Sequence, residues 1–318
     1  NSPICQKLSA GLMNGYGKFM GSLPVGISET FPIGSGTNLK LIEENKRISM
    51  IERGFDPDRL AEIDQFAEQV IDSAMTPGMQ ILVAKRGKII YHKSFGHHTY
   101  DRKIKVENHH LYDLASLTKI TATLPLIMRE VDLNNFGLES PLKDFMPEFE
   151  GSNKANLSVK EVLSHYARLT PWIPFYKETL DDNAQQLRKF YRNRKKNRFG
   201  IPVANQLYLR TNFTKKIVEQ VMESPLLDSL YYRYSDLPYY LFKNYFERKY
   251  FKSLDDLADE FLYQPLGLER TLFNPLKEIP KEEIVPSEID DYFRHQELQG
   301  YVHDMGAAMQ GGVGGHAG

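Results

Sequence analysis

A serine and a lysine three residues apart are the pair in this chain best placed to do chemistry together. In Ser116-Leu117-Thr118-Lys119 the two side chains would share one face at a helix start, one turn apart. A serine hydroxyl is a weak nucleophile at neutral pH, and a partly desolvated lysine can lose its own proton and accept that of the serine. The helix N-terminus would add positive potential where an oxyanion forms. The same tetrapeptide also arises by chance, so it predicts nucleophilic catalysis only together with its context.

A second candidate follows much later in the chain, at Tyr234-Ser235-Asp236. A tyrosine can pass protons when a cation keeps its phenol acidic, and the residue two positions on can point into the same cleft. The chain has 18 tyrosines, most of which we expect to be packing residues. The order of the two motifs therefore carries more weight than the tyrosine itself.

Together the two motifs resemble the serine β-lactamase and penicillin-binding-protein superfamily, in which S-x-x-K precedes Y-x-N. Three further blocks look like its class C β-lactamase and esterase branch. They are the expected hairpin over 79–95, Val162-Leu163-Ser164-His165, and Gln264-Pro265-Leu266-Gly267-Leu268-Glu269-Arg270-Thr271. The resemblance covers roughly residues 56–318.

This resemblance implies a role for each matching residue. Ser116 matches the acylated nucleophile, Lys119 its base, and Tyr234 the residue that shuttles the proton to and from the leaving group. Asp236 stands where the β-lactamases have asparagine, at a substrate-binding position. Asparagine offers an NH₂ donor to a substrate carbonyl, whereas an ionised aspartate offers only acceptors. Esterase or amidase chemistry is therefore expected before β-lactam hydrolysis, and no cofactor is implied.

Two more residues are candidates for substrate binding. His316-Ala317-Gly318 has the shape of the family's third motif, a Lys/His-Thr/Ser-Gly on the strand that lines the site. The glycine-rich residues just before His316 are more typical of a loop than of a strand, so the alternative is that the true motif lies beyond Gly318. The domain would then be truncated, without the strand that supplies half of the oxyanion hole, and inactive as it stands. Trp172 lies in an aromatic loop and would line the substrate mouth or pack in the core.

The first residues resemble a different family. Gly17-Lys18-Phe19-Met20-Gly21-Ser22-Leu23-Pro24-Val25 and Phe31-Pro32-Ile33-Gly34 look like the end of a family 3 glycoside hydrolase. In one bacterial architecture a β-N-acetylglucosaminidase-like enzyme of that family is followed directly by a β-lactamase-like module. This resemblance implies a glycosidase tail and linker over 1–50, a serine hydrolase module over 51–318, and a covalently linked glycosidase upstream. It also implies a small-molecule or peptidoglycan-type substrate and a periplasmic or secreted protein. The alternative is a non-catalytic accessory or binding module, with the whole protein acting as a β-N-acetylglucosaminidase.

Composition excludes several other classes of function. Of 318 residues 41% are apolar, enough for a sizeable core, and the net charge is −1, which argues against nucleic-acid binding by bulk charge. The single cysteine, Cys5, excludes an internal disulfide and a cysteine zinc site. The histidines before Ser116 lack the spacing of metal ligands, so no metal is expected. No apolar run approaches the ~18 residues of a membrane helix. The basic stretch 188–198 is typical of a solvated face or a mobile insert.

The pattern of apolar residues predicts helices and an antiparallel hairpin, and the resemblance implies that they form an α+β fold of the β-lactamase type, with an antiparallel sheet flanked by helices. A helix over 56–75, opened by Asp56-Pro57, should pack on a sheet made of the 79–95 hairpin and C-terminal strands. A mostly helical region over about 120–275 should contain helices at 158–164, 183–194, 212–222, 237–248 and 254–263. The helix that opens at Ser116 should bury one apolar face, made of Leu117, Ile120, Leu124, Ile127 and Val131. We expect the active site in the cleft between sheet and helices.

Overall fold

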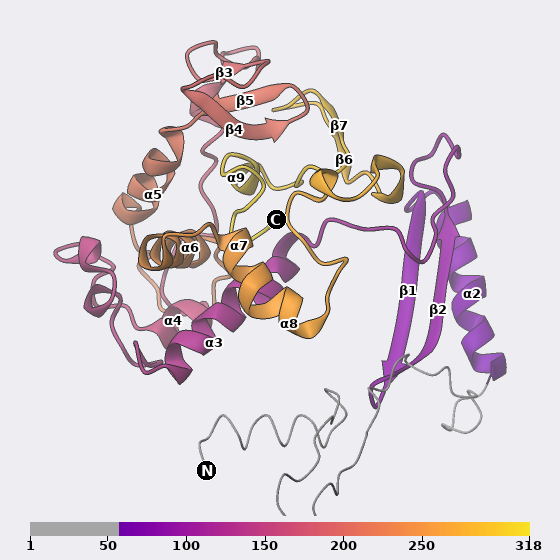
Figure 1. The fold of residues 1–318 in the computed structure, drawn as a ribbon, viewed down its shortest axis with the longest axis horizontal. Coiled ribbons are helices and arrows are strands. Elements are labelled where there is room, and N and C mark those ends of the chain that lie inside the picture. Colours follow the sequence, from indigo (N-terminus) through magenta and orange to yellow (C-terminus); the bar gives the residue numbers. More distant parts are fainter. Residues whose placement is uncertain (1–56) are drawn as a thin grey trace, which may run out of the picture. The chain divides into compact units, whose positions relative to one another are not determined.

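The computed structural model describes residues 57–318 (Figure 1). They belong to two compact units that divide after Asn108. The expected glycosidase tail over 1–50 and the helix cap at Asp56 lie outside the described residues. No helix within 57–318 is long and apolar enough to cross a membrane.

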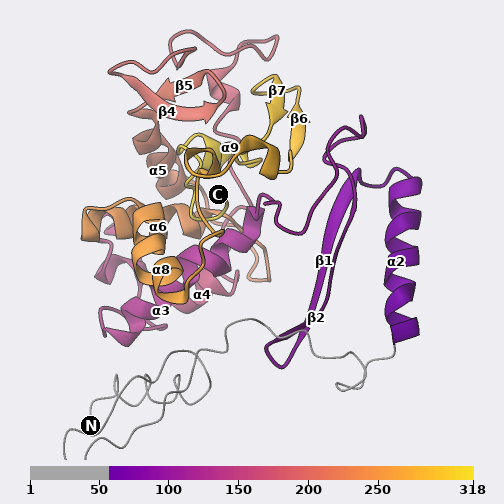
Figure 2. The ribbon, with the colours of Figure 1, turned by 45° about the vertical axis from the view of Figure 1, so that its right-hand side comes forward.

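The described part of the first unit is one helix and one hairpin, as the pattern predicts. Helix α2 (Pro57–Asp72) is followed by β1 (Gly78–Lys85) and β2 (Lys88–Gly96), which pair antiparallel. Leu60 from the helix and Ile90 and Tyr91 from β2 form its small core. Figure 2 shows α2 running alongside the two strands.

The second unit is built mainly of helices around one large apolar core. Helix α6 (Leu237–Tyr250) is buried at nine of its 14 residues, which is typical of a central helix. The other helices are α3 (Leu124–Asp132), α4 (Val159–Leu163), α5 (Phe213–Glu223), α7 (Leu254–Ala258), α8 (Gln264–Leu266) and α9 (Met305–Ala308). Helices α4 to α7 begin within one residue of the predicted positions, and Asp259–Tyr263 continues α7 as a wider turn.

The helix predicted over 183–194 is wrong. The chain there forms turns and then a three-stranded antiparallel sheet of order β3-β5-β4, made of β3 (Tyr191–Arg192), β4 (Phe199–Ala204) and β5 (Leu207–Arg210). Val203 and Leu209 are buried in the core from this sheet. Asn193 and Asn197 favour turns, and this local preference overrides the helical spacing. The basic stretch 188–198 is mostly exposed on the connections of the sheet.

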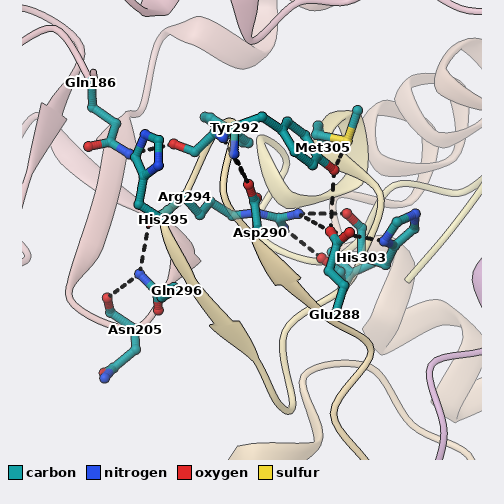
Figure 3. A network of polar contacts seen from close by, with 12 residues as sticks. Gln186, Asn205, Glu288, Asp290, Tyr292, Arg294, His295, Gln296, His303 and Met305 are labelled. Carbon is teal, nitrogen blue, oxygen red and sulfur yellow. Dashed lines mark hydrogen bonds and ion pairs between the residues drawn. The ribbon is translucent and has the colours of Figure 1, made fainter. Parts of the chain in front are cut away.

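The C-terminal strands do not join the hairpin of the first unit as expected. β6 (Glu288–Asp290) and β7 (Gln296–Leu298) pair only with each other among the described residues. Their turn is fixed by Arg294, whose Nε lies 2.6 Å from Asp290 Oδ2 and whose other nitrogens donate to the carbonyls of Val302 and His303 (Figure 3). Both charged side chains are fully buried. This buried pair holds a hairpin of two three-residue strands, which is too short to be stable alone.

Candidate active site

The segment that carries Ser116 is a sequence of tight turns. A 3-10 turn over Ala115–Leu117 is followed by a π-turn over Lys119–Thr123 and then by α3. Ala115 has φ 45°, a left-handed conformation that costs a residue with a Cβ roughly 1–2 kcal/mol. Asp113 stabilises the turn, because its carboxylate accepts from the amide nitrogens of Ala115 (2.7 Å) and His303 (2.6 Å). The result is an exposed Ser116 at the start of the turn.

The apolar face predicted for this segment is wrong at its first two positions. Leu117 and Ile120 are 54% and 56% exposed. The inward residues of the π-turn are Lys119, Ala122 and Thr123 instead. A π-turn takes about one more residue per turn than an α-helix, so it rotates the buried face. This rotation is what turns the lysine inward.

Lys119 lies beneath Ser116 and is almost completely buried, with 4% of its side chain exposed. Its Nζ is 3.0 Å from Ser116 Oγ, 3.0 Å from the backbone oxygen of His316, and 2.6 Å from Asp236 Oδ1. The first two contacts are hydrogen bonds, and the third is an ion pair. The expected serine–lysine pair and Asp236 are therefore brought together in space.

Tyr234 also lies at the amine. Its ring centroid is 4.9 Å from Lys119 Nζ, and that of Tyr239 is 5.3 Å away. An ammonium group is attracted to aromatic rings at such distances. Tyr234 is 41% exposed, so it lies at the surface where a substrate can reach it.

His165, to which the sequence analysis gave no role, holds the loop of Tyr234. Its Nδ1 accepts from the amide of Ser235 at 3.2 Å, its backbone oxygen accepts from the amide of Arg233 at 2.9 Å, and its ring lies 4.6 Å from that of Tyr234. Burial lowers the pKa of His165, and the charge of Lys119 lowers it further against the opposing effect of Asp236. A neutral ring with its proton on Nε2 fits this acceptor role.

The loop that carries Tyr234 and Asp236 is also bonded to the segment just before Trp172. The Asp236 amide donates to Pro171 O at 2.9 Å, and Ser235 Oγ donates to Thr170 O at 2.7 Å. Trp172 follows directly and is 51% exposed, which disfavours the core role that the sequence left open. Its place beside Asp236 is compatible with a substrate mouth, and its binding role stays a prediction.

His316 is buried, and its ring stacks on that of Tyr240 with the ring centroids 4.3 Å apart. Its Nε2 lies 2.7 Å from Asp304 Oδ1 and its Nδ1 3.0 Å from Gly314 O. Burial opposes ionisation of Asp304, but the charge and hydrogen bond of His316 and the amide of Ala307 hold its pKa well below the usual range. Both ring nitrogens therefore lie within hydrogen-bond distance of an oxygen.

Residues 316–318 are not in a strand, and the contact of His316 with the site is made by its backbone oxygen. A substrate contact of the imidazole stays a prediction.

Three of these side chains could offer oxygen and nitrogen ligands to a cation. The ligand atoms of Asp236, Asp304 and His316 lie within 4.8 Å of one another. Lys119 Nζ lies 2.6 Å from Asp236 Oδ1, and His316 Nε2 lies 2.7 Å from Asp304 Oδ1. Both carboxylates therefore already have a partner among the protein's own side chains.

Comparison with known proteins identifies the family. The profile of the family described as Beta-lactamase matches residues 63–295. The chain belongs to this family. Among curated relatives, an N-acetylmuramyl-L-alanine amidase of Bacillus subtilis is 27% identical, and the match covers 92% of this chain and 65% of the relative. The Escherichia coli protein named "Putative D-alanyl-D-alanine carboxypeptidase" is also 27% identical, over 83% of this chain and 61% of its own length. The chain thus spans less than two thirds of these relatives.

Solved structures support the β-lactamase type of fold. A penicillin-binding protein homologue from Pyrococcus abyssi, an octamer, is 17% identical with a TM-score of 0.57, covering 81% of this chain and 52% of its own. EstCE1, a hydrolase with promiscuous acyltransferase activity, is 18% identical with a TM-score of 0.54, over 82% and 68% of the two chains. At these identities the likeness concerns the fold, and it confirms the α+β class predicted from sequence.

Proposed function

We propose that this β-lactamase family member is a serine hydrolase that forms an acyl-enzyme on Ser116. The observation that carries the proposal is the 3.0 Å contact between the buried Lys119 Nζ and the exposed Ser116 Oγ. A nucleophile within hydrogen-bond reach of a desolvated base is the arrangement that covalent catalysis needs. An exposed hydroxyl above a buried amine also lets a substrate reach the serine while water is kept from the lysine.

The chemistry follows from the contacts of the amine. Lys119 in its neutral form takes the proton of Ser116 as Oγ attacks the acyl carbon, and the carbonyl electron pair moves to its oxygen. When the bond to the leaving group breaks, Tyr234, beside the same amine, passes a proton to it. Water then attacks the acyl-enzyme by the reverse proton transfers and frees the acid.

The relatives support an ester or amide bond in cell-wall material as the target. One is named as an amidase of an N-acetylmuramyl-alanine linkage and another as a D-alanyl-D-alanine carboxypeptidase. Both names describe cleavage of an amide bond next to an alanine residue. A periplasmic or secreted location would bring the enzyme to that substrate.

The linked glycosidase is part of the proposal, and its support is the sequence motif alone. The motif over 17–34 resembles the end of a family 3 glycoside hydrolase. An upstream β-N-acetylglucosaminidase-like domain would act on the glycan while this unit acts on acyl groups.

Covalent labelling tests the hydrolase directly. A fluorophosphonate probe should label the full-length protein once, at Ser116, as located by peptide mass spectrometry. Labelling should be lost in Ser116→Ala and reduced by at least about a hundredfold in rate in Lys119→Ala. Ser287→Ala removes an exposed serine outside the site and should label normally. Labelling that persists in Ser116→Ala, or none in the folded wild type, would exclude the acyl-enzyme.

One observation favours the second candidate, a non-catalytic accessory module of the glycosidase. Asp236 lies 2.6 Å from Lys119 Nζ and stabilises the ammonium form, which cannot accept the proton of Ser116. A folded protein that binds glycan fragments in calorimetry but resists the probe would support this candidate.

A further inference from the structure

Asp236, the ion-pair partner of Lys119, bears on which substrates the site accepts. We propose that Asp236 selects acyl substrates with a protonated amine next to the scissile carbonyl, and that this amine replaces Lys119 as the partner of the carboxylate. The inference rests on the proposed serine hydrolase function. It gives the class of substrate that an aspartate would bind at the position where the β-lactamases have asparagine.

The charges of the site show why a cation is needed. With Lys119 protonated, its positive charge balances the negative charge of Asp236, whose Oδ1 lies 2.6 Å from Lys119 Nζ. When Lys119 is neutral and ready to act as base, one negative charge is left without a partner. A desolvated, unpaired carboxylate is costly, so the neutral form of the lysine is disfavoured unless another cation is supplied.

The unpaired charge falls on Asp236 and not on Asp304. Asp304 keeps its contacts with His316 Nε2 and the Ala307 amide, both at 2.7 Å. Asp236 Oδ1 forms its ion pair with Lys119 and accepts no hydrogen bond of good geometry from the described residues. His165 cannot supply the charge, since burial and the charge of Lys119 lower its pKa.

The position of Asp236 fixes where the substrate amine would sit. Oδ1 is buried against Lys119, but the side chain as a whole is 20% exposed, so a ligand can approach the carboxylate from its open side. Lys119 Nζ separates Asp236 Oδ1 from Ser116 Oγ by two short contacts. An amine on the carbon beside the acyl carbon fits this spacing. A carboxylate at the same position would face Asp236 as a like charge and be rejected.

The exchange couples substrate binding to activation. Binding of the ammonium group to Asp236 lets Lys119 release its proton to solvent, so the total charge of the site is unchanged. The neutral amine then takes the proton of Ser116 as the bond between Oγ and the acyl carbon forms. Substrates without the cation would leave the base protonated and react slowly.

Paired boronic acids test the inference. 1-Aminoethylboronic acid carries the ammonium group, and its N-acetyl derivative carries a neutral amide in the same place. Each is titrated against fluorophosphonate labelling of Ser116 in the full-length protein. The wild type should bind the free amine more tightly by roughly tenfold or more, and Asp236→Asn should abolish or reverse that ratio. Comparing the two variants cancels the difference in size between the inhibitors.

Controls separate this inference from the proposed function. Asp182→Asn, an exposed aspartate outside the site, should keep the wild-type ratio. Asp236→Asn should also label faster with the neutral fluorophosphonate, because Lys119 no longer has a carboxylate to hold its proton. Equal ratios in wild type and Asp236→Asn, with normal labelling, would overturn the amine selection and leave the hydrolase intact. A wild type that does not label at all would overturn both.

Discussion

At the scale of single residues, the site is organised around one buried amine whose partners are of different kinds. Ser116 is a neutral hydroxyl, Asp236 a carboxylate, and His316 contributes a backbone oxygen. Only the carboxylate discriminates strongly between the charged and the neutral amine. Asp236 is therefore the partner of Lys119 whose replacement should change the chemistry of the site most.

The hydroxyl of Tyr234 should matter for rate rather than for binding. Tyr234→Phe keeps the ring beside Lys119 and His165 but removes the proton carrier. We expect kcat for an aminoacyl ester to fall by about a hundredfold with KM nearly unchanged. Tyr232→Phe, whose ring also packs on His165 at 6.0 Å, is the matched control. Equal effects of the two changes would argue against a role for the Tyr234 hydroxyl.

His165 acts through the loop that it holds, so it is a positioning residue. His165→Ala removes the acceptor for the Ser235 amide and should lower kcat about tenfold. Asn is tolerated at the φ of 61° found here, and its side-chain oxygen can accept the same bond, so His165→Asn should recover part of the rate. If Asn and Ala are equally slow while both variants melt like the wild type, the positioning role is wrong.

At the scale of secondary structure, a buried carboxylate joins the two helices that carry the site. Glu130 on α3 is 0% exposed and accepts from Tyr245 OH and Asn135 Nδ2, each at 2.9 Å. Lys249 and Tyr250 also bond to it, so three of its partners lie on α6. The Lys119 turn precedes α3 and Asp236 precedes α6, so this network sets the spacing between base and carboxylate.

Loss of the Glu130 carboxylate should destabilise the fold and flatten its response to acid. Burial alone would raise the pKa of Glu130, but the bonds from Lys249, Tyr250 and Tyr245 lower it overall. Its stabilisation is therefore present above the unfolded pKa of about 4.5 and lost as pH falls through the lower folded value. Glu130→Ala should cost about 3 kcal/mol in urea unfolding at pH 7.

The matched control is Glu139→Ala, which breaks an exposed pair with Lys160. It should change the free energy of unfolding by less than about 1 kcal/mol. A similar small loss for Glu130→Ala would mean that the network contributes little.

Helices in which the apolar residues keep a regular spacing over many residues could be predicted. Segments in which a turn changes that spacing could not. Helices α5 and α6 follow the sequence period, because their buried faces are unbroken. The π-turn after Ser116 could not be foreseen, since Leu117 and Ile120 keep helical spacing and yet lie on the surface. Only contacts with distant residues, such as Thr123 Oγ1 with Gly315 O, make the rotated face favourable.

At the scale of the whole molecule, the family and the order of its motifs could be predicted from sequence, but not the chemistry of the centre. The serine–lysine spacing follows from helix geometry. The ion pair of Lys119 with Asp236, and the support from His165 and His316, join segments about 70 to 200 residues apart in the chain. No local pattern encodes such pairings, so they needed the structure.

The hydrolase and the proposed glycosidase should be separable activities. Glycosidases commonly use a pair of carboxylates, and Glu148 and Glu150 lie two residues apart in one loop. Glu148 is bound to Arg248 and Asn244, so it is engaged in a structural contact. This chain should therefore not turn over a chromogenic N-acetylglucosaminide, while the same preparation labels at Ser116. The measurement is release of the chromophore against an enzyme of known activity. Turnover that persists in Ser116→Ala would place a glycosidase centre within these residues.

The bond from Lys119 to the main-chain oxygen of His316 has a consequence for the dynamics of turnover. A peptide carbonyl accepts from an ammonium and from an uncharged amine alike, so this tether persists whichever form the lysine takes. The nitrogen can then gain and lose protons in every cycle without swinging away from the hydroxyl. Little atomic rearrangement has to accompany each proton transfer, so the rate of the transfer would depend on the binding of the substrate.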